Sequence, residues 1–252
     1  QIDWEAPGYI AVSKSVHLLA NLTFVDLYFD EAHHPLPIGC PDAENTYLFS
    51  ATHRAQPDFR YRLDEAIEDG ILRDYDLTVP VVDEDDAIGG LAGMLLREAG
   101  HFRRILAYCN SIEDALRFRE ALDQRGMAAW HINGDTPEAE RQRVLGVFSG
   151  PLRKPVHVLV TVQVLGEGVN IENADTCLFV EPRRSYISIV QAIGRVLRWH
   201  ACKPQAHIIL PAVTSTYRPR DFHEEPPGCE RQMETPNKPR HGADSATPLE
   251  NT

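Results

Sequence analysis

Short apolar runs alternate along this chain with amphipathic stretches of helical period, and this alternation limits the folds that the chain can adopt. Such a pattern is typical of a parallel β-sheet flanked by helices, so the sequence predicts an α/β fold. The run LTFVDLYF at residues 22–29 is nearly continuous in apolar and β-favouring residues, as expected of a strand buried on both faces. Two more short strands are predicted at residues 47–49 and 77–82, and the acidic stretch at residues 83–86 is predicted to be a linker.

A second series of alternating elements follows this linker. Ser111 has the position of a helix N-cap, with Asp114 three residues later as the shorter relative of a capping-box glutamate. The predicted helices cover residues 88–98, 112–125, 137–148 and 187–199, and the predicted strands cover residues 105–109, 128–132, 156–162, 176–180 and 206–210. From residue 217 the chain becomes rich in proline and poor in apolar residues, which predicts disorder.

Charge and cysteine content restrict the classes of function. The formal net charge is −12, whereas a protein that binds nucleic acid by bulk attraction is usually basic, so any nucleic-acid path here must be a local groove. The five cysteines have no paired CxxC spacing, which predicts reduced intracellular thiols rather than a zinc knuckle or a disulfide framework. No apolar run approaches the roughly 20 residues that a membrane span needs, so no membrane partner is predicted. Neither the compartment nor the protein partners can be predicted from the sequence.

Two acidic residues, Asp30 and Glu31, follow the first predicted strand directly. The carboxyl ends of parallel strands are where such sheets bind ligands. Asp30 is therefore placed to hold Mg²⁺, directly or through water, and Glu31 to polarise an attacking water. An ordinary polar loop would explain the two acids equally well. The tripeptide Ser50-Ala51-Thr52 follows the next predicted strand, where its hydroxyls can bridge the metal loop to backbone, although this is also a common capping sequence.

Residues 185–198 (SYISIVQAIGRVLR) carry the most specific pattern. On a helix Gln191, Arg195 and Arg198 are spaced i, i+4 and i+7, which predicts that all three lie on one face. Two guanidinium groups on one outward face suit a triphosphate, because each can bind phosphate oxygens with two donors. A solvated basic stripe is the alternative, but it explains poorly why Gln191 and Gly194 lie on the same face.

A predicted buried strand also leads into Gly166-Glu167-Gly168. Glycines at such a position let backbone approach a ligand, and a plain tight turn would have the same sequence.

These segments occur in a characteristic order. DEAHH, SAT, ILAYC, TVQVLGEGVNI and QAIGRVLR resemble motifs II to VI of superfamily two helicases. The chain is most similar to the DEAD/DEAH-type branch that includes the motor subunits of type I and type III restriction enzymes. Residues 61–75 resemble the segment that joins the two lobes in that branch, and Ser13-Lys14-Ser15 occupy the place of a strand-contacting motif. The resemblance covers roughly residues 10–212.

The resemblance implies two RecA-like lobes. Residues 1–82 would be the C-terminal part of lobe 1, residues 83–100 a linker and first helix, residues 101–216 a complete lobe 2, and residues 217–252 a disordered tail. ATP would bind between the lobes and a nucleic-acid strand would cross both, with DNA favoured over RNA.

The same resemblance implies roles for individual residues. Catalysis would involve Asp30, with its Mg²⁺, and Glu31, His33, Gln191, Arg195 and Arg198, the arginines facing the two acids across one nucleotide pocket, while His34 would be structural. Ser50 and Thr52 would couple hydrolysis to motion. The nucleotide-binding residues would be Gly166, Glu167, Gly168 and Asn170, and the nucleic-acid-binding residues Ser13, Lys14, Ser15 and Thr161.

Two departures from the family pattern bear on activity. Helicases bind phosphates with a Gly-rich loop that ends in Gly-Lys-Thr or Gly-Lys-Ser, but no lysine of this chain follows a glycine. We expect that loop upstream of Gln1, together with the first strands of lobe 1. Asn170 replaces an aspartate that many relatives have near the ribose.

Two functions therefore remain open. The first is a portion of an ATP-dependent helicase or translocase, and the second is a non-catalytic module that binds nucleic acid or a partner. A metal site at His33, His34 and Cys40, or at His200 and Cys202, fits no usual ligand set.

Overall fold

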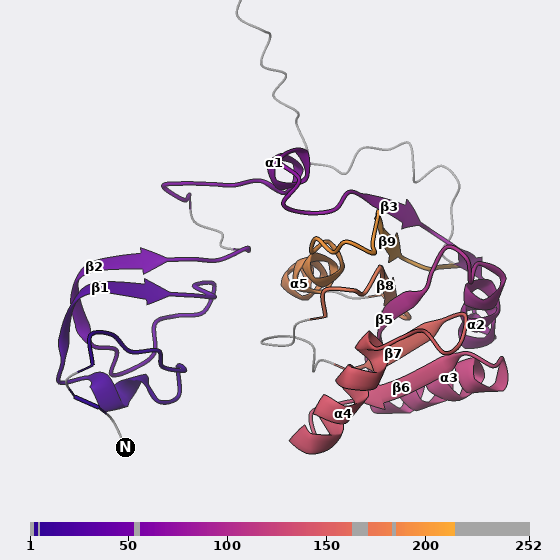
Figure 1. Ribbon diagram of the computed structural model, residues 1–252, viewed down its shortest axis with the longest axis horizontal. Coiled ribbons are helices and arrows are strands. Elements are labelled where there is room, and N and C mark those ends of the chain that lie inside the picture. The colour runs from indigo at the N-terminus through magenta and orange to yellow at the C-terminus, as the bar shows by residue number, and fades with distance from the viewer. Residues whose placement is uncertain (1–2, 5, 53–55, 163–170, 183–184, 215–252) are drawn as a thin grey trace, which may run out of the picture. The chain divides into compact units, whose positions relative to one another are not determined.

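The computed structural model describes residues 3–4, 6–52, 56–162, 171–182 and 185–214 (Figure 1). The predicted tail at residues 217–252 lies outside these ranges, as do Gly166, Glu167, Gly168 and Asn170. None of the helices within the described ranges combines the length and the apolar character that crossing a bilayer requires.

The main element of the fold is a six-stranded parallel sheet with the order β3-β9-β8-β5-β7-β6 (Figure 1). Its central strands are buried along almost their whole length, as the continuous apolar runs of the sequence require. The strands are β3 (Tyr75–Thr78), β5 (Arg104–Tyr108), β6 (Ala128–Ile132), β7 (His157–Thr161), β8 (Thr176–Phe179) and β9 (Ala206–Ile209).

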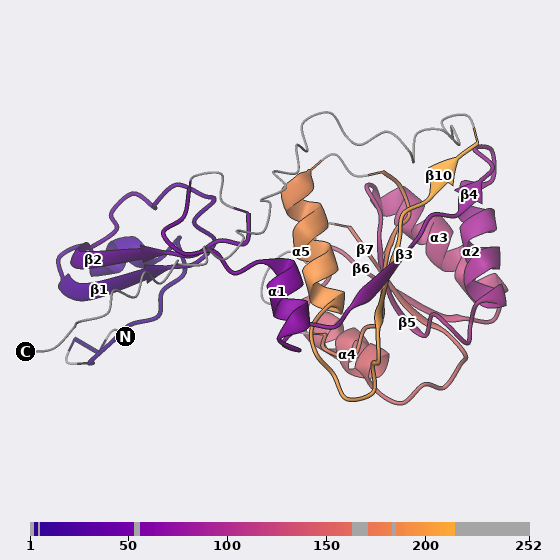
Figure 2. The ribbon, with the colours of Figure 1, turned by 90° about the horizontal axis from the view of Figure 1, so that it is seen from above.

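Helices cover both faces of this sheet (Figure 2). One core cluster contains Leu91 of α2 (Ala87–Arg97) and Phe118 of α3 (Ile112–Gln124). The other contains Phe148 of α4 (Glu138–Ser149) and Val196 of α5 (Tyr186–Val196). The mixed α/β class predicted from the sequence is confirmed.

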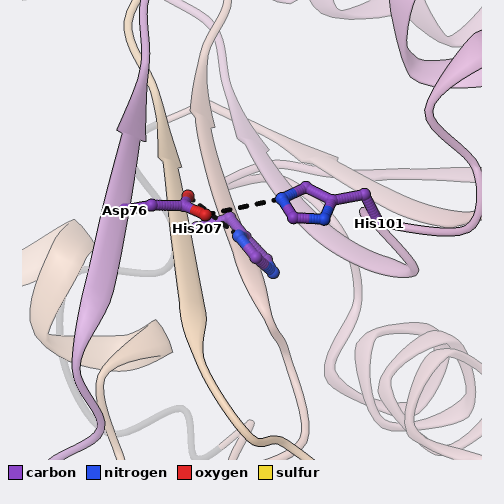
Figure 3. A group of neighbouring side chains, drawn as sticks. All are labelled: Asp76, His101 and His207. Carbon is purple, nitrogen blue, oxygen red and sulfur yellow. Dashed lines mark hydrogen bonds and ion pairs between the residues drawn. The ribbon is translucent and has the colours of Figure 1, made fainter.

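The edge strand β3 corrects one expectation. Residues 77–82 were expected to form one strand at the end of the first lobe, but β3 pairs with β9, and β4 (Val81–Val82) pairs with β10 (Ala212–Val213). Pro80 lies between β3 and β4 and cannot donate a backbone hydrogen bond. Asp76 of β3 also lies beside His207 of β9 (Figure 3). A strand pattern gives no information on which sheet edge the strand will join, so this assignment could not come from the sequence.

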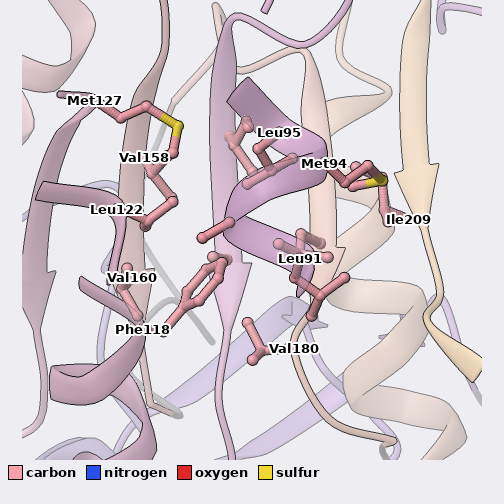
Figure 4. Close-up of a cluster of buried hydrophobic side chains, with 14 of the residues drawn as sticks. Leu91, Met94, Leu95, Phe118, Leu122, Met127, Val158, Val160, Val180 and Ile209 are labelled. Atoms are coloured by element: carbon pink, nitrogen blue, oxygen red, sulfur yellow. The ribbon is translucent and has the colours of Figure 1, made fainter. Parts of the chain in front are cut away.

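Alternation along the strands determines which cluster each side chain enters. On β7, Val158 and Val160 pack in the cluster under α2 and α3 (Figure 4), whereas Leu159 between them packs in the cluster under α4 and α5. This is the period of two that strand geometry imposes.

A separate two-stranded parallel sheet precedes the large one in the chain. It consists of β1 (Thr23–Phe29) and β2 (Asp42–Leu48), which is longer than the predicted strand at residues 47–49. The expectation that β1 is buried on both faces is wrong for the described residues, since Val25 is 61% and Tyr28 65% exposed. The reason is that β1 pairs there with β2 alone, and Tyr28 stacks on Tyr47 with ring centroids 5.0 Å apart.

Two short helical segments complete the described part: a 3₁₀ helix at Val16–Leu19, and α1 at Leu63–Glu68.

Candidate functional site

The two loops that follow β1 and β2 are joined by backbone hydrogen bonds. Ala32 N donates to Phe49 O over 2.8 Å, and Phe49 N donates to Phe29 O over 2.9 Å. Parallel pairing puts the carboxyl ends of both strands at one sheet edge, so the acidic loop lies beside the loop of Ser50 and Thr52. The structure thus brings together two motifs about twenty residues apart in sequence.

The acidic loop has an unusual backbone. Glu31 has φ +55°, and it is the one non-glycine residue with positive φ in the described part of the chain. The exposed Asp30 accepts a hydrogen bond from Glu31 N at its Oδ1, over 2.9 Å. Residues held in the left-handed region cost free energy and persist where surrounding contacts fix them, often at functional sites. Here the neighbouring backbone bond from Ala32 provides such a contact.

His33 lies against Glu31. Its Nδ1 is 3.1 Å from Glu31 Oε2, and the His33 side chain is 10% exposed. The ring of His34 lies next to that of His33, with centroids 4.1 Å apart, but His34 itself is exposed. The side chain of His33 therefore contacts the carboxylate of Glu31, whereas His34 bonds to Glu31 through its backbone, its N donating to Glu31 O over 3.0 Å.

The hydroxyl loop has one polar atom that its surroundings do not satisfy. Thr52 N donates to Ser50 Oγ over 3.2 Å, while Thr52 Oγ1 is buried and has no hydrogen-bond partner among the described residues. A buried hydroxyl without a hydrogen-bond partner lowers the stability of the fold, unless a bound molecule provides that partner.

The residues expected to contact nucleic acid lie in two places in the fold. Ser13 and Lys14 are exposed, and Ser15 is half-buried directly before the 3₁₀ helix. Thr161 ends β7; it is fully buried, and within the described residues its Oγ1 has no hydrogen-bond partner.

Helix α5 carries Gln191 and Arg195, but the predicted three-residue face is wrong for Arg198. The helix ends at Val196, and Arg198 forms an isolated antiparallel bridge with Leu72. Arg195 is also 7% exposed rather than pointing into solvent, and burial lowers the pKa of its guanidinium. The helical period predicted one continuous face because it contains no information about where the helix ends.

Lys203 explains where the helix ends, and sequence reasoning missed it. Its ammonium is buried and donates to the carbonyl oxygens of Val196 at 2.8 Å, and of Glu172 and Ala174 at 3.0 Å. These bonds satisfy the C-terminal carbonyl of α5 with a cation, which is the favourable charge at that helix end. Burial lowers the pKa of Lys203 to about 8, and the nearby carboxylate of Asp175 opposes that shift. No local pattern distinguishes this lysine from an exposed one.

Part of the chain is similar to proteins that are named helicases. Residues 89–200 match the family described as helicase conserved C-terminal domain. The chain is 26% identical over 175 residues to "Probable helicase A859L" of an African swine fever virus isolate, covering 63% of this chain and 20% of that protein. It is 32% identical over 114 residues to "Putative mitochondrial ATP-dependent helicase irc3" of Schizosaccharomyces pombe, covering 45% of this chain and 18% of that protein.

Among solved structures, the fold matches "ATP-dependent Type ISP restriction-modification enzyme LlaBIII bound to DNA". The TM-score is 0.66 at 19% identity, over 85% of this chain and 20% of that one.

These findings show that part of the chain is similar to helicases and that its fold is of the RecA-like α/β type. The similarity to a helicase C-terminal domain covers residues 89–200. The chain spans about a fifth of the length of the curated relatives described above.

Proposed function

We propose that this chain is a portion of an ATP-dependent helicase or translocase that couples ATP hydrolysis to movement on nucleic acid. The observation that carries the proposal is the pair of backbone hydrogen bonds that hold the acidic loop of Asp30 and Glu31 against the loop of Ser50 and Thr52. Two such loops at the carboxyl edge of parallel strands are placed where a nucleotide binds in α/β folds. The helicase names of the relatives support the same class.

The two acids have different roles in this proposal. Asp30 is exposed and its carboxylate oxygens are the ligand type that Mg²⁺ prefers, so the residue fits the metal. Bound Mg²⁺ supplies positive charge to the β- and γ-phosphates. Glu31 orients and deprotonates the attacking water, and His33, in contact with Glu31, relays the state of the nucleotide. Ser50 and Thr52 couple the acidic loop to the motion of the chain.

The second lobe supplies the groups that stabilise transferred charge. Arg195 and Arg198, with Gln191, would contact the γ-phosphate opposite Asp30 and Glu31, because guanidinium groups bind phosphate oxygens with two donors. Glycines at 166 and 168, with Glu167 and Asn170, would approach the nucleotide. Hydrolysis then changes the contacts between the lobes, and this conformational change drives movement along the nucleic acid.

In this proposal the protein moves along a nucleic-acid strand. Ser13, Lys14, Ser15 and Thr161 would contact its backbone, and DNA is favoured over RNA by the likeness to restriction-enzyme motors. A local groove suits a chain whose net charge is −12. The lobe boundaries that we propose are those predicted from the sequence, with one change. Strands β3 and β4, at residues 75–82, belong to the second lobe, because they pair with β9 and β10.

The test is nucleic-acid-stimulated phosphate release. It compares the 252-residue chain with an N-terminally extended protein in which a Gly-Lys-Thr or Gly-Lys-Ser loop precedes it. We expect turnover only from the extended protein, and in that protein Glu31→Gln should reduce the rate about 10²-fold or more. Glu44→Gln, the same change at an exposed residue of β2, is the matched control and should leave the rate unchanged.

Arginine variants test the second half of the site. Arg198→Ala should reduce the rate of the extended protein by about 10³-fold, as removal of an arginine finger does, whereas Arg117→Ala on the exposed side of α3 should not. Nucleic-acid binding without turnover in the extended protein, unaffected by Glu31→Gln, would instead establish the non-catalytic binding module.

A further inference from the structure

Three side chains from separate parts of the sequence meet at one edge of the large sheet. Asp76 comes from β3, His207 from β9, and His101 from the connection between α2 and β5 (Figure 3). Asp76 Oδ1 lies 2.9 Å from His207 Nδ1, and Asp76 Oδ2 lies 3.4 Å from His101 Nε2. One candidate ligand atom of each residue lies within 4.8 Å of those of the other two.

The fold, and not chance proximity of mobile side chains, sets this arrangement. The register of β3 and β9 places Asp76 opposite His207, so both are fixed by backbone pairing. The side chain of His207 is 9% exposed, and the ring of Phe102 packs edge-on against both imidazoles. An apolar wall beside a group of ligands limits solvent access and orients the rings.

The three candidate ligand atoms lie close enough together to bind one small divalent cation. A tetrahedral zinc ion with bonds of about 2.0–2.1 Å keeps its ligand atoms roughly 3.3 Å apart. Each imidazole nitrogen lies near that distance from one of the two oxygens of Asp76, at 2.9 Å from Oδ1 for His207 and at 3.4 Å from Oδ2 for His101. Two imidazoles and one carboxylate are a ligand set that suits zinc, and three protein ligands leave a fourth position for water. Solvent can supply it, because the side chain of His101 is 51% exposed.

An ordinary ion-pair network explains the arrangement less completely. The two imidazoles lie with ring centroids only 4.2 Å apart, and a single carboxylate serves both. A divalent cation bound by both imidazoles and by this carboxylate accounts for the three contacts together.

We propose that Asp76, His101 and His207 form a zinc-class divalent cation site that ties strand β3 to the body of the second lobe. The strand needs such a tie, since it is short and lies at the sheet edge, where Tyr75 is 39% and Leu77 55% exposed. It is also the first strand of that sheet along the chain, so the site fixes the point where the chain enters it. This site is independent of nucleotide binding.

Zinc binding to the full chain is the direct test, with Zn²⁺ alone as the probe, titrated in competition with a chromophoric chelator. The parent protein carries Cys40→Ser, Cys202→Ser and Cys229→Ser, so that these three thiols do not contribute, while Cys109 and Cys177 are buried. We expect one equivalent per chain, and binding weaker by a factor of about ten or more in His101→Ala, a loss that even outer-shell changes produce. His17→Ala, which removes an exposed histidine elsewhere, is the matched control and should bind as the parent does.

Two further measurements separate the site from adventitious binding. Co²⁺ in the parent should give visible ligand-field bands without thiolate charge transfer, and His101→Ala should lose them. Zn²⁺ should slow hydrogen exchange in residues 74–79 of the parent but not of His101→Ala. His101→Gln serves as a second variant if His101→Ala does not fold. Absence of saturable binding at one equivalent, or equal binding by the parent and both His101 variants, overturns the proposal.

Discussion

The ammonium of Lys203 lies 2.8 Å from the carbonyl oxygen of Val196, the last residue of α5. The same ammonium also binds the carbonyls of Glu172 and Ala174, so the end of the helix is fixed to the turn that leads into β8. Arg195 directly precedes Val196, and Arg198 follows two residues later. We therefore infer that Lys203 fixes the backbone beside Arg195 and Arg198, the two arginines of the proposed site.

Replacing Lys203 with methionine should destabilise the second lobe. The change leaves three carbonyl oxygens without their charged donor in a buried place, and each unsatisfied group costs about 1–3 kcal/mol. Loss of the buried charge offsets part of this, so we expect a fall of about 3 kcal/mol in the free energy of unfolding, measured by urea titration. Lys154→Met is the control: this exposed lysine makes one such bond, to Met127 O, and its replacement should change stability by about 0.5 kcal/mol or less. Equal effects of the two changes would contradict the role of Lys203.

Lys203 should also make stability depend on alkaline pH. Burial lowers its pKa from the ordinary 10.5 to about 8 in the folded chain. Between these two values the unfolded chain binds more protons than the folded one, so the free energy of unfolding rises with pH across that window. The penalty for burying the charge is fully present below pH 8 and is relieved as the pH approaches 10.5. Urea titrations of the wild type and Lys203→Met from pH 7 to 11 measure this difference, and a difference that stays constant across the window would exclude it.

Local elements of the fold were predictable from local sequence. The expected helix at residues 112–125 is α3, Ile112–Gln124, because Ser111 and Asp114 are capping residues whose effect acts within one turn. The predicted central strands agree with β5 and β7 because a buried parallel strand produces a continuous apolar run, which is also a local signal.

Relations between distant segments were not predictable. The exposure of Val25 on β1 depends on which strands are present beside it, and the pairing of β3 depends on an open edge at β9. Lys203 and the cluster of Asp76, His101 and His207 depend on contacts between residues far apart in the sequence, which no spacing rule encodes. That the acidic loop lies beside the hydroxyl loop could be predicted from the sequence only because parallel strands align their carboxyl ends.

The N-cap of α3 offers a test of local energetics. Ser111 Oγ accepts a hydrogen bond from Asp114 N over 3.0 Å and donates one to Asp114 Oδ2 over 2.6 Å. Ser111→Ala removes both and should lower the free energy of unfolding by about 1 kcal/mol. Ser188→Ala, at a half-buried residue in the first turn of α5, provides the comparison, and we expect a change of about 0.5 kcal/mol or less from it. Indistinguishable urea midpoints for Ser111→Ala and the wild type would show that the cap contributes nothing.

The left-handed backbone of Glu31 should separate stability from function. Glycine adopts φ +55° without a steric penalty, whereas an ordinary side chain there costs on the order of 1 kcal/mol. Glu31→Gly should therefore keep or strengthen the bond from Ala32 N to Phe49 O, and exchange of the Ala32 amide hydrogen should be as slow as in the wild type or slower. In the N-terminally extended protein the same variant should lose ATP hydrolysis, because the carboxylate proposed to activate water is gone.

His34→Gly is the matched control for this experiment. His34 follows in the same loop with an ordinary negative φ, so glycine there adds only chain entropy and should speed exchange of the Ala32 amide. Faster exchange in Glu31→Gly than in His34→Gly would mean that the carboxylate of Glu31, through its contact with His33, holds the loop together. In that case the positive φ of Glu31 does not destabilise the loop, and the site does not maintain a strained backbone for the sake of function.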